Sequence, residues 1–87
     1  MYVVGVYDIN VKRVAKVKKI FQRYMFWMQN STFEGRLTKA QLRELKNALK
    51  MVINPREDHI IFYVIRNEEV LKKEVIGDNH QEPSNIL

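Results

Sequence analysis

The chain of 87 residues is predicted to form one α+β domain of the ferredoxin-like type, with strands and helices in the order βαββαβ. Two observations lead to this fold class. Short runs of β-branched and aromatic residues, apolar on both alternating faces, open the chain and return near residue 60. Between them, two stretches with apolar residues at helical spacing flank a central segment that divides into a hairpin.

The first strand and the first helix are predicted within residues 2–24. The run YVVGVY at residues 2–7 is typical of a central strand, which ends at Asp8. Asn10 is the expected N-cap of the helix that follows. Its buried stripe is predicted from apolar residues at steps of three and four: Val14, Val17, Phe21 and Tyr24.

The middle of the chain is predicted to form a hairpin and then a second helix. Two apolar segments within residues 25–35 flank the polar residues 29–31, which indicates two strands and a tight turn. Thr38 and Gln41 have the capping-box spacing that starts a helix. The residues expected to pack inward are Leu37, Leu42, Leu45, Leu49 and Val52. We expect the Asn-Pro pair at residues 54–55 to end this helix, because the residue before a proline avoids the helical region.

The last core strand is predicted at residues 59–65, HIIFYVI. Residues 70–76, VLKKEVI, are predicted to add one further strand, so that the domain spans residues 1–76. Residues 77–87 then form a polar C-terminal tail that ends in Ile86-Leu87. Such a tail is either disordered or docks on a partner protomer.

The two outer faces of the predicted sheet differ in what covers them. In this fold both helices cover one face, yet the first and last core strands are apolar on both faces. A homodimer whose sheets face each other about a two-fold axis would cover the second face. The alternative is a tail that folds back over its own sheet.

Positive charge is concentrated in the first part of the chain. Residues 1–56 hold twelve Lys and Arg against three acidic residues, a net charge of +9, whereas residues 57–87 have a net charge of −4. This division favours a nucleic-acid partner bound through its phosphates, although a solvated basic face has the same composition. The candidate phosphate-binding residues are Lys12, Arg13, Lys16, Lys19 and Arg23 on the first helix, with Arg36, Lys39 and Arg43.

The composition excludes several classes of function. The chain has no cysteine, which excludes disulfides, thiolate metal sites and a cysteine nucleophile. Its two histidines, His59 and His80, are too few and too far apart for a zinc site, and three scattered glycines form no phosphate-binding loop. There is no apolar run of membrane-spanning length and no secretory signal, so a cytoplasmic protein is expected.

Asp8 lies between the first strand and the first helix, and no other acidic residue precedes Glu34. Three roles remain open for it: a structural carboxylate at the helix N-terminus, a general base, or a magnesium ligand. The structural role ranks first because capping carboxylates are common. One carboxylate per chain is a poor metal site, but a two-fold axis near the strand end would supply two Asp8 side chains to one Mg²⁺ ion. Glu34, beside Gly35, is expected to be a solvated turn residue.

Four segments resemble the CRISPR-associated protein two (Cas-two) family in order and spacing: VVGVYDIN, MQNSTFEG, RLTKAQL and IIFYVIR. The resemblance covers essentially the whole chain. It implies ferredoxin-like homodimers in which a strand from the C-terminal region pairs onto the partner. At matching positions it also implies that Asp8 is a divalent-metal ligand, one from each protomer, and that Arg13, Ser31 and Phe33 lie at a catalytic nuclease site.

Two functions follow from the resemblance. In the first, the homodimer binds duplex DNA together with the CRISPR integrase subunit during spacer acquisition, and it also acts as a metal-dependent endonuclease on RNA or DNA. In the second, the protein is a free-standing toxin-type endoribonuclease of the same fold. The DNA-binding role requires a basic surface and a dimer, whereas the nuclease role also requires a competent metal site.

Overall fold

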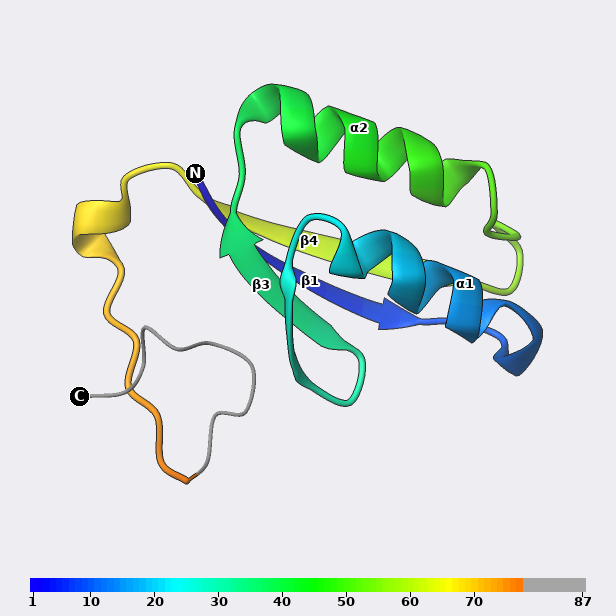
Figure 1. The fold of residues 1–87 in the computed structure, drawn as a ribbon, viewed down its shortest axis with the longest axis horizontal. Coiled ribbons are helices and arrows are strands. Elements are labelled where there is room, and N and C mark those ends of the chain that lie inside the picture. The colour runs from blue at the N-terminus through cyan, green and yellow to red at the C-terminus, as the bar shows by residue number, and fades with distance from the viewer. Residues whose placement is uncertain (78–87) are drawn as a thin grey trace.

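The computed structural model describes residues 1–77 and confirms the ferredoxin-like fold, a four-stranded antiparallel sheet with both helices on one side (Figure 1). The strand order is β2-β3-β1-β4, so the first strand is central, as predicted. The strands are β1 (Tyr2–Asp8), β2 (Phe26–Gln29), β3 (Thr32–Arg36) and β4 (His59–Ile65), and the helices are α1 (Val11–Gln22) and α2 (Lys39–Lys50).

The start of α1 is the one that the sequence predicts. The Oδ1 atom of Asn10 accepts a hydrogen bond from the amide of Lys12 at 3.0 Å, which satisfies one of the free amides at the helix start. The buried residues of the helix are Val17, Ile20 and Phe21. Tyr24 was expected to extend this stripe but lies beyond the helix, because its amide closes a turn on the carbonyl of Phe21 and leads into β2.

The predicted hairpin is confirmed between β2 and β3. Its turn contains Asn30, whose φ of 41° lies in the left-handed region that asparagine tolerates better than most residues. Trp27 pairs with Phe33 in the ladder, and a register shift follows between Trp27 and Gln29. The turn brings Ser31 alongside the end of β1, where its carbonyl accepts the amide of Tyr7 at 3.0 Å.

The start of α2 is also confirmed, but its end is not. Thr38 and Gln41 exchange both hydrogen bonds of a capping box, at 3.1 and 2.9 Å. The helix ends at Lys50, about one turn before the proline that was expected to end it. The chain turns early because the amide of Asn54 donates to the side chain of Asp58 at 2.8 Å instead of continuing the helical pattern.

The core lies between the helices and the facing side of the sheet. Its fully buried side chains are Val3, Val17, Phe21, Phe33, Leu45 and Leu49. The rings of Phe21 and Phe33 stack with their centroids 5.0 Å apart. Gly5 of β1 permits this arrangement, since a Cβ atom at that position would lie 2.7 Å from Cε1 of Phe21. The absence of a side chain at Gly5 therefore sets how closely α1 approaches the sheet.

The opposite face of the sheet is only partly covered. Tyr63 is 56% exposed and Phe26 is 48% exposed. After β4 the chain forms a short 3₁₀ helix, η1 (Glu68–Val70), and residues 71–76 then lie against this open face near β3. An ion pair of 2.7 Å between Lys73 and Glu34 holds the segment there.

The additional C-terminal strand predicted at residues 70–76 is not formed, so that prediction is wrong for the single chain. The segment lies over the open face of the sheet, where Lys73 pairs with Glu34 of β3, rather than along the free edge of β2 or β4, and so it adds no strand to the sheet. The part of the tail that includes His80 and Ile86-Leu87 lies outside residues 1–77, and its predicted docking stays a prediction.

Replacement of Gly5 by alanine is expected to destabilise the fold by about 1–3 kcal/mol, because the new methyl group overlaps the ring of Phe21. Urea unfolding of the two proteins measures the difference. The variant Gly5→Ala combined with Phe21→Leu should recover part of the loss, since the smaller side chain makes room. Equal stability of Gly5→Ala and the wild type would contradict this account of the packing.

Candidate nucleic-acid and phosphodiester site

Asp8 is the last residue of β1, and its side chain is exposed at the end of the sheet. The strand register places it opposite His59, the first residue of β4. Among residues 1–77, no side chain or backbone amide hydrogen-bonds or ion-pairs with the carboxylate of Asp8. The group is therefore available to a ligand from solvent.

The structural role that ranked first for Asp8 is wrong. The helix N-terminus is capped by the side chain of Asn10, and the amide of Asn10 itself donates to Asp58 at 2.8 Å. Asp8 lies two residues before this cap, still in the extended strand, so its carboxylate does not reach the free amides of the helix.

Asp58 forms the most extensive polar cluster at this end of the sheet, although its side chain is completely buried. Its Oδ1 atom accepts from the amide of Asn10 at 2.8 Å and from Nη2 of Arg13 at 3.1 Å. Its Oδ2 atom accepts from Nε of Arg13 at 2.6 Å and from the amide of Asn54 at 2.8 Å. Four donors thus compensate the cost of burying the charge. We call these groups the Asp58 clamp.

The clamp shifts the ionisation of both partners. The paired guanidinium of Arg13, followed by the amides of Asn10 and Asn54, holds the pKa of Asp58 well below its usual value of 3.8. The hydrogen bonds from Arg13 to Asp58 and to Glu57 raise the pKa of the guanidinium. Both groups are therefore charged at neutral pH.

Arg13 is thus already occupied within the chain. Besides Asp58 it binds Glu57 at 2.8 Å, and its side chain is 21% exposed. The sequence shows no acidic partner for Arg13 along α1, but two partners lie 44 and 45 residues further along the chain. Of the eight candidate phosphate-binding residues, Arg13 has its charge most fully compensated.

The other two residues assigned to a nuclease site, Ser31 and Phe33, lie in different surroundings in the structure. Ser31 is half-buried in the hairpin turn and lies next to the end of β1, through its hydrogen bond to Tyr7. Phe33 is 0% exposed and stacks on Phe21 in the core. The assignment of Phe33 as a catalytic residue is therefore wrong, because its ring faces the helices and cannot touch a substrate.

The remaining basic side chains form two rows on the helical layer. In α1 and its C-cap residue Arg23, the spacing of four, three and four residues places the cations on one face of the helix. A shorter row follows on α2, with a four-residue spacing. The cations in the rows are Lys12, Lys16, Lys19 and Arg23, then Lys39 and Arg43. All six are exposed, and none has an ion-pair partner within residues 1–77. Arg36 differs because it binds Glu68 at 2.6 Å.

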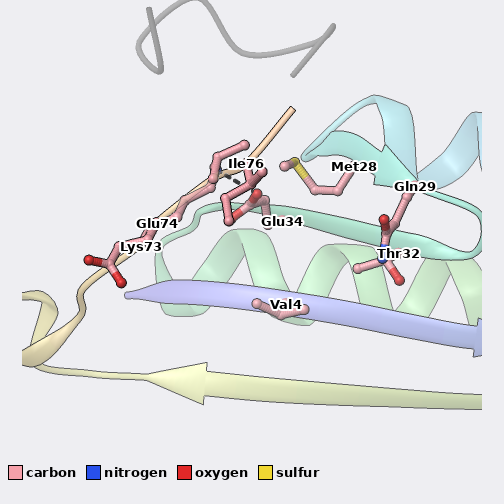
Figure 2. A pocket seen from close by; sticks show the side chains of 9 residues that line it. Val4, Met28, Gln29, Thr32, Glu34, Lys73, Glu74 and Ile76 are labelled. Atoms are coloured by element: carbon pink, nitrogen blue, oxygen red, sulfur yellow. Dashed lines mark ion pairs between the residues drawn. The ribbon is translucent and has the colours of Figure 1, made fainter. Parts of the chain in front are cut away.

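Glu34 is not the solvated turn residue that was expected. It lies within β3, is only 6% exposed and accepts a hydrogen bond from the hydroxyl of Tyr2. Together with Lys73 it borders a hollow of about 360 Å³ between the open face and residues 73–76 (Figure 2). Its charge is compensated by the ion pair with Lys73, so this cluster holds the C-terminal segment to the sheet.

The end of β1 offers a metal ion one carboxylate ligand, that of Asp8. Magnesium binds through one or two carboxylates and keeps several waters, so the oxygen donor of Asp8 is of the right type. Within residues 1–77, however, no three His, Cys, Asp or Glu side chains come together, so one chain alone supplies an incomplete site.

Neither helix in the same range is long and apolar enough to cross a membrane.

The fold and its charges define a class: a small ferredoxin-like domain with exposed, uncompensated cations on its helices and a free carboxylate at a strand end. The family model described as "CRISPR associated protein Cas2" matches residues 1–73. The chain therefore belongs to the CRISPR-associated protein Cas2 family, which confirms the resemblance seen in its sequence.

Individual relatives agree with this assignment. The chain is 48% identical over 87 residues to "CRISPR-associated endoribonuclease Cas2" of Methanosarcina acetivorans, with 100% of both chains covered. It is 47% identical over 77 residues to "CRISPR-associated endoribonuclease Cas2 2" of Archaeoglobus fulgidus, which covers 88% of this chain and 84% of the relative.

Solved structures of the family are similar as well. A Cas2 crystal structure matches with a TM-score of 0.79 at 42% identity and covers 92% of this chain and 90% of that one. The Cas2 structure of Streptococcus pyogenes matches with a TM-score of 0.73 at 32% identity, over 88% of this chain and 100% of that one. The fold is therefore shared over nearly the whole described range.

Sequence reasoning missed the Asp58 clamp and the buried position of Glu34. A signal for the clamp was present, since Asp58 directly precedes a strand and follows the turn-forming residues 54–55. Its pairing with Arg13 depends on which loops meet at the sheet end, and that is a property of the topology.

Stability is expected to fall as the pH drops below about 4, because the pKa of Asp58 is lowered in the folded state. The stabilisation is complete above the unfolded pKa of 3.8 and is lost as the pH falls toward the lower folded value. The difference between the urea midpoints of the wild type and Asp58→Asn should therefore be largest at pH 7, begin to narrow at pH 3 and narrow further at pH 2. The control Glu44→Gln, which removes an exposed carboxylate, should show no such convergence. A constant gap between the wild type and Asp58→Asn would contradict the assignment.

Proposed function

We propose that this protein acts in CRISPR spacer acquisition, in the cytoplasm, as a homodimer that binds duplex DNA together with the CRISPR integrase subunit. The observation behind this proposal is the pair of cation rows on α1 and α2, which have no compensating acidic groups within residues 1–77. The row from Lys12 to Arg23 spans about 16 Å at 1.5 Å per residue. A row of that length faces several phosphates of a duplex, whose strands each place one about every 3.4 Å along the axis.

The proposed dimer uses the open face of the sheet. Ile61 and Tyr63 of β4 are 37% and 56% exposed on this face, and a second copy would cover them. Asp8 pairs with His59, and the alternation along β4 places Asp8 on the same face as these two residues. A two-fold axis through this face near the strand ends would therefore bring two Asp8 side chains together.

The same dimer is proposed to hydrolyse phosphodiester bonds. The curated relatives are named endoribonucleases, which favours a nuclease activity. A magnesium ion held by two Asp8 carboxylates would activate water and neutralise charge on the scissile phosphate. The chain's own contributions are the carboxylates that hold the ion and the cation rows that orient the nucleic acid. Ser31, beside the end of β1, is placed to contact the substrate.

The alternative is a free-standing toxin-type endoribonuclease of the same fold, and the names of the relatives support its endoribonuclease activity. The two proposals share the fold, the dimer and Asp8, and they differ in substrate and partner. Affinity purification from cells distinguishes them, because recovery without an integrase subunit favours the alternative.

Duplex binding is expected to depend steeply on salt. Replacement of Lys16, Lys19 and Arg23 together by glutamine should lower the slope of log K against log salt by up to about 3, at roughly 0.9 per phosphate contact. A matched control replaces Arg56, Arg66 and Lys72, which lie outside the rows, and changes the net charge equally. Fluorescence anisotropy at several salt concentrations measures both. Equal slopes for the two triple variants would refute a role for the rows.

Cleavage is expected to require both magnesium and Asp8. Asp8→Asn removes the ligand charge but keeps the side-chain size, so it should reduce cleavage at least 100-fold while dimerisation and duplex binding persist. The assay uses single-stranded RNA and duplex DNA, with magnesium and with a chelator. Glu44→Gln is the control, since Glu44 is exposed on α2 away from the strand end. Unchanged cleavage by Asp8→Asn would exclude Asp8 as the ligand.

A further inference from the structure

The carboxylate of Asp8 has no side-chain support of its own. Among the residues that the structure describes, nothing hydrogen-bonds or ion-pairs with it. Its place is therefore set by the backbone on either side: β1 before it, the connection to α1 after it, and the β4 residue opposite it, His59. Whatever fixes these segments also fixes the backbone position from which the carboxylate extends.

The Asp58 clamp fixes all of them at once. Asp58 directly precedes His59, and it holds the amide of Asn10 two residues beyond Asp8. Through Asn54 it also holds the end of the turn that leads into β4. Its charge, completely buried, is satisfied by four donors from three parts of the chain, and such an arrangement has few alternative geometries.

We infer that Asp58 is a positioning residue for Asp8, and that Arg13 acts through Asp58 rather than on the substrate. The clamp orients the end of β1 and the first turn of α1 as one unit, so that Asp8 and the cation row of α1 keep a fixed relation. The inference rests on the proposed function of Asp8, and it gives Arg13 a role different from the direct one that the family resemblance implies.

The geometry of Arg13 supports the indirect role. Its Nε and Nη2 atoms form a two-point contact with the two oxygens of Asp58, and Nη2 also binds Glu57. A planar fork of this kind is specific to arginine, since lysine offers a point charge. A phosphate would have to displace a completely buried carboxylate to gain the same contacts, and that exchange would leave Asp58 uncompensated.

The test combines Asp58→Asn, Arg13→Lys and the double variant with amide hydrogen exchange followed by NMR. Asp58→Asn should accelerate exchange at least 10-fold at Asn10, Asp8 and His59. At Val3, in the middle of the sheet, the change should stay below about 3-fold. A residue that only stabilised the fold would accelerate exchange everywhere. The control Glu68→Gln breaks the comparable pair with Arg36 at the other end of β1, and should leave exchange at Asp8 unchanged.

Steady-state cleavage provides the second readout. Asp58→Asn should lower kcat at least 10-fold while KM and duplex affinity change less than 3-fold, because the cation rows remain. In the wild-type background Arg13→Lys should lower kcat. In the Asp58→Asn background the same substitution should lower kcat by less than a further 3-fold, since the two residues act as one unit. If Arg13→Lys has the same effect in both backgrounds, Arg13 acts on the substrate and the inference fails.

The exchange measurement separates failure of the inference from failure of the proposed function. If the wild type does not cleave, the catalytic part of the proposed function is lost, yet local acceleration at Asp8 still supports the positioning role. Unchanged exchange at Asp8 in a folded Asp58→Asn overturns the inference whether or not the wild type cleaves. If Asp58→Asn does not fold, Arg13→Lys keeps the positive charge and provides the same local comparison.

Discussion

The ion pair between Arg13 and Asp58 is the interaction on which this end of the molecule depends. A carboxylate with no solvent exposure is costly unless its charge is fully hydrogen-bonded, and here four donors meet that requirement. The donors come from the β1–α1 connection, from α1 and from the turn before β4. The cost of burial therefore becomes a constraint that ties these three segments together.

The core imposes a second constraint from the other side of α1. Phe21 lies so close to Gly5 that no side chain fits between them, which fixes the helix against the centre of the sheet. With Arg13 attached at the helix start and Phe21 packed near its end, α1 has two fixed points. The helix backbone that carries the row of exposed cations is consequently held in a fixed orientation relative to the sheet.

Local signals predicted most of the fold, and most of the failures have a common cause. The Asn10 cap, the Thr38 capping box and the strand periods each depend on residues a few positions apart, and all were confirmed. The end of α2 was misplaced because of a local contact between Asn54 and Asp58, whereas the other errors concern contacts between distant segments. Phe33 was assigned to a catalytic site by its match to a family motif, whereas the alternation of β3 turns its ring into the core. Residues 70–76 were predicted to form a strand, but they lie over the face of the sheet through the contact of Lys73 with Glu34, 39 residues earlier in the chain.

The same distinction explains the candidate site. Asp8 and Asp58 lie at the same end of the sheet, one residue apart in the β1–β4 register, yet their surroundings are opposite. Asp58 is buried and compensated by Arg13, while Asp8 is exposed and has no partner within residues 1–77. Because Asp58 and Glu57 compensate the charge of Arg13, the strand end keeps an unpaired carboxylate beside a helix with exposed cations, which is the arrangement on which the proposed metal site rests.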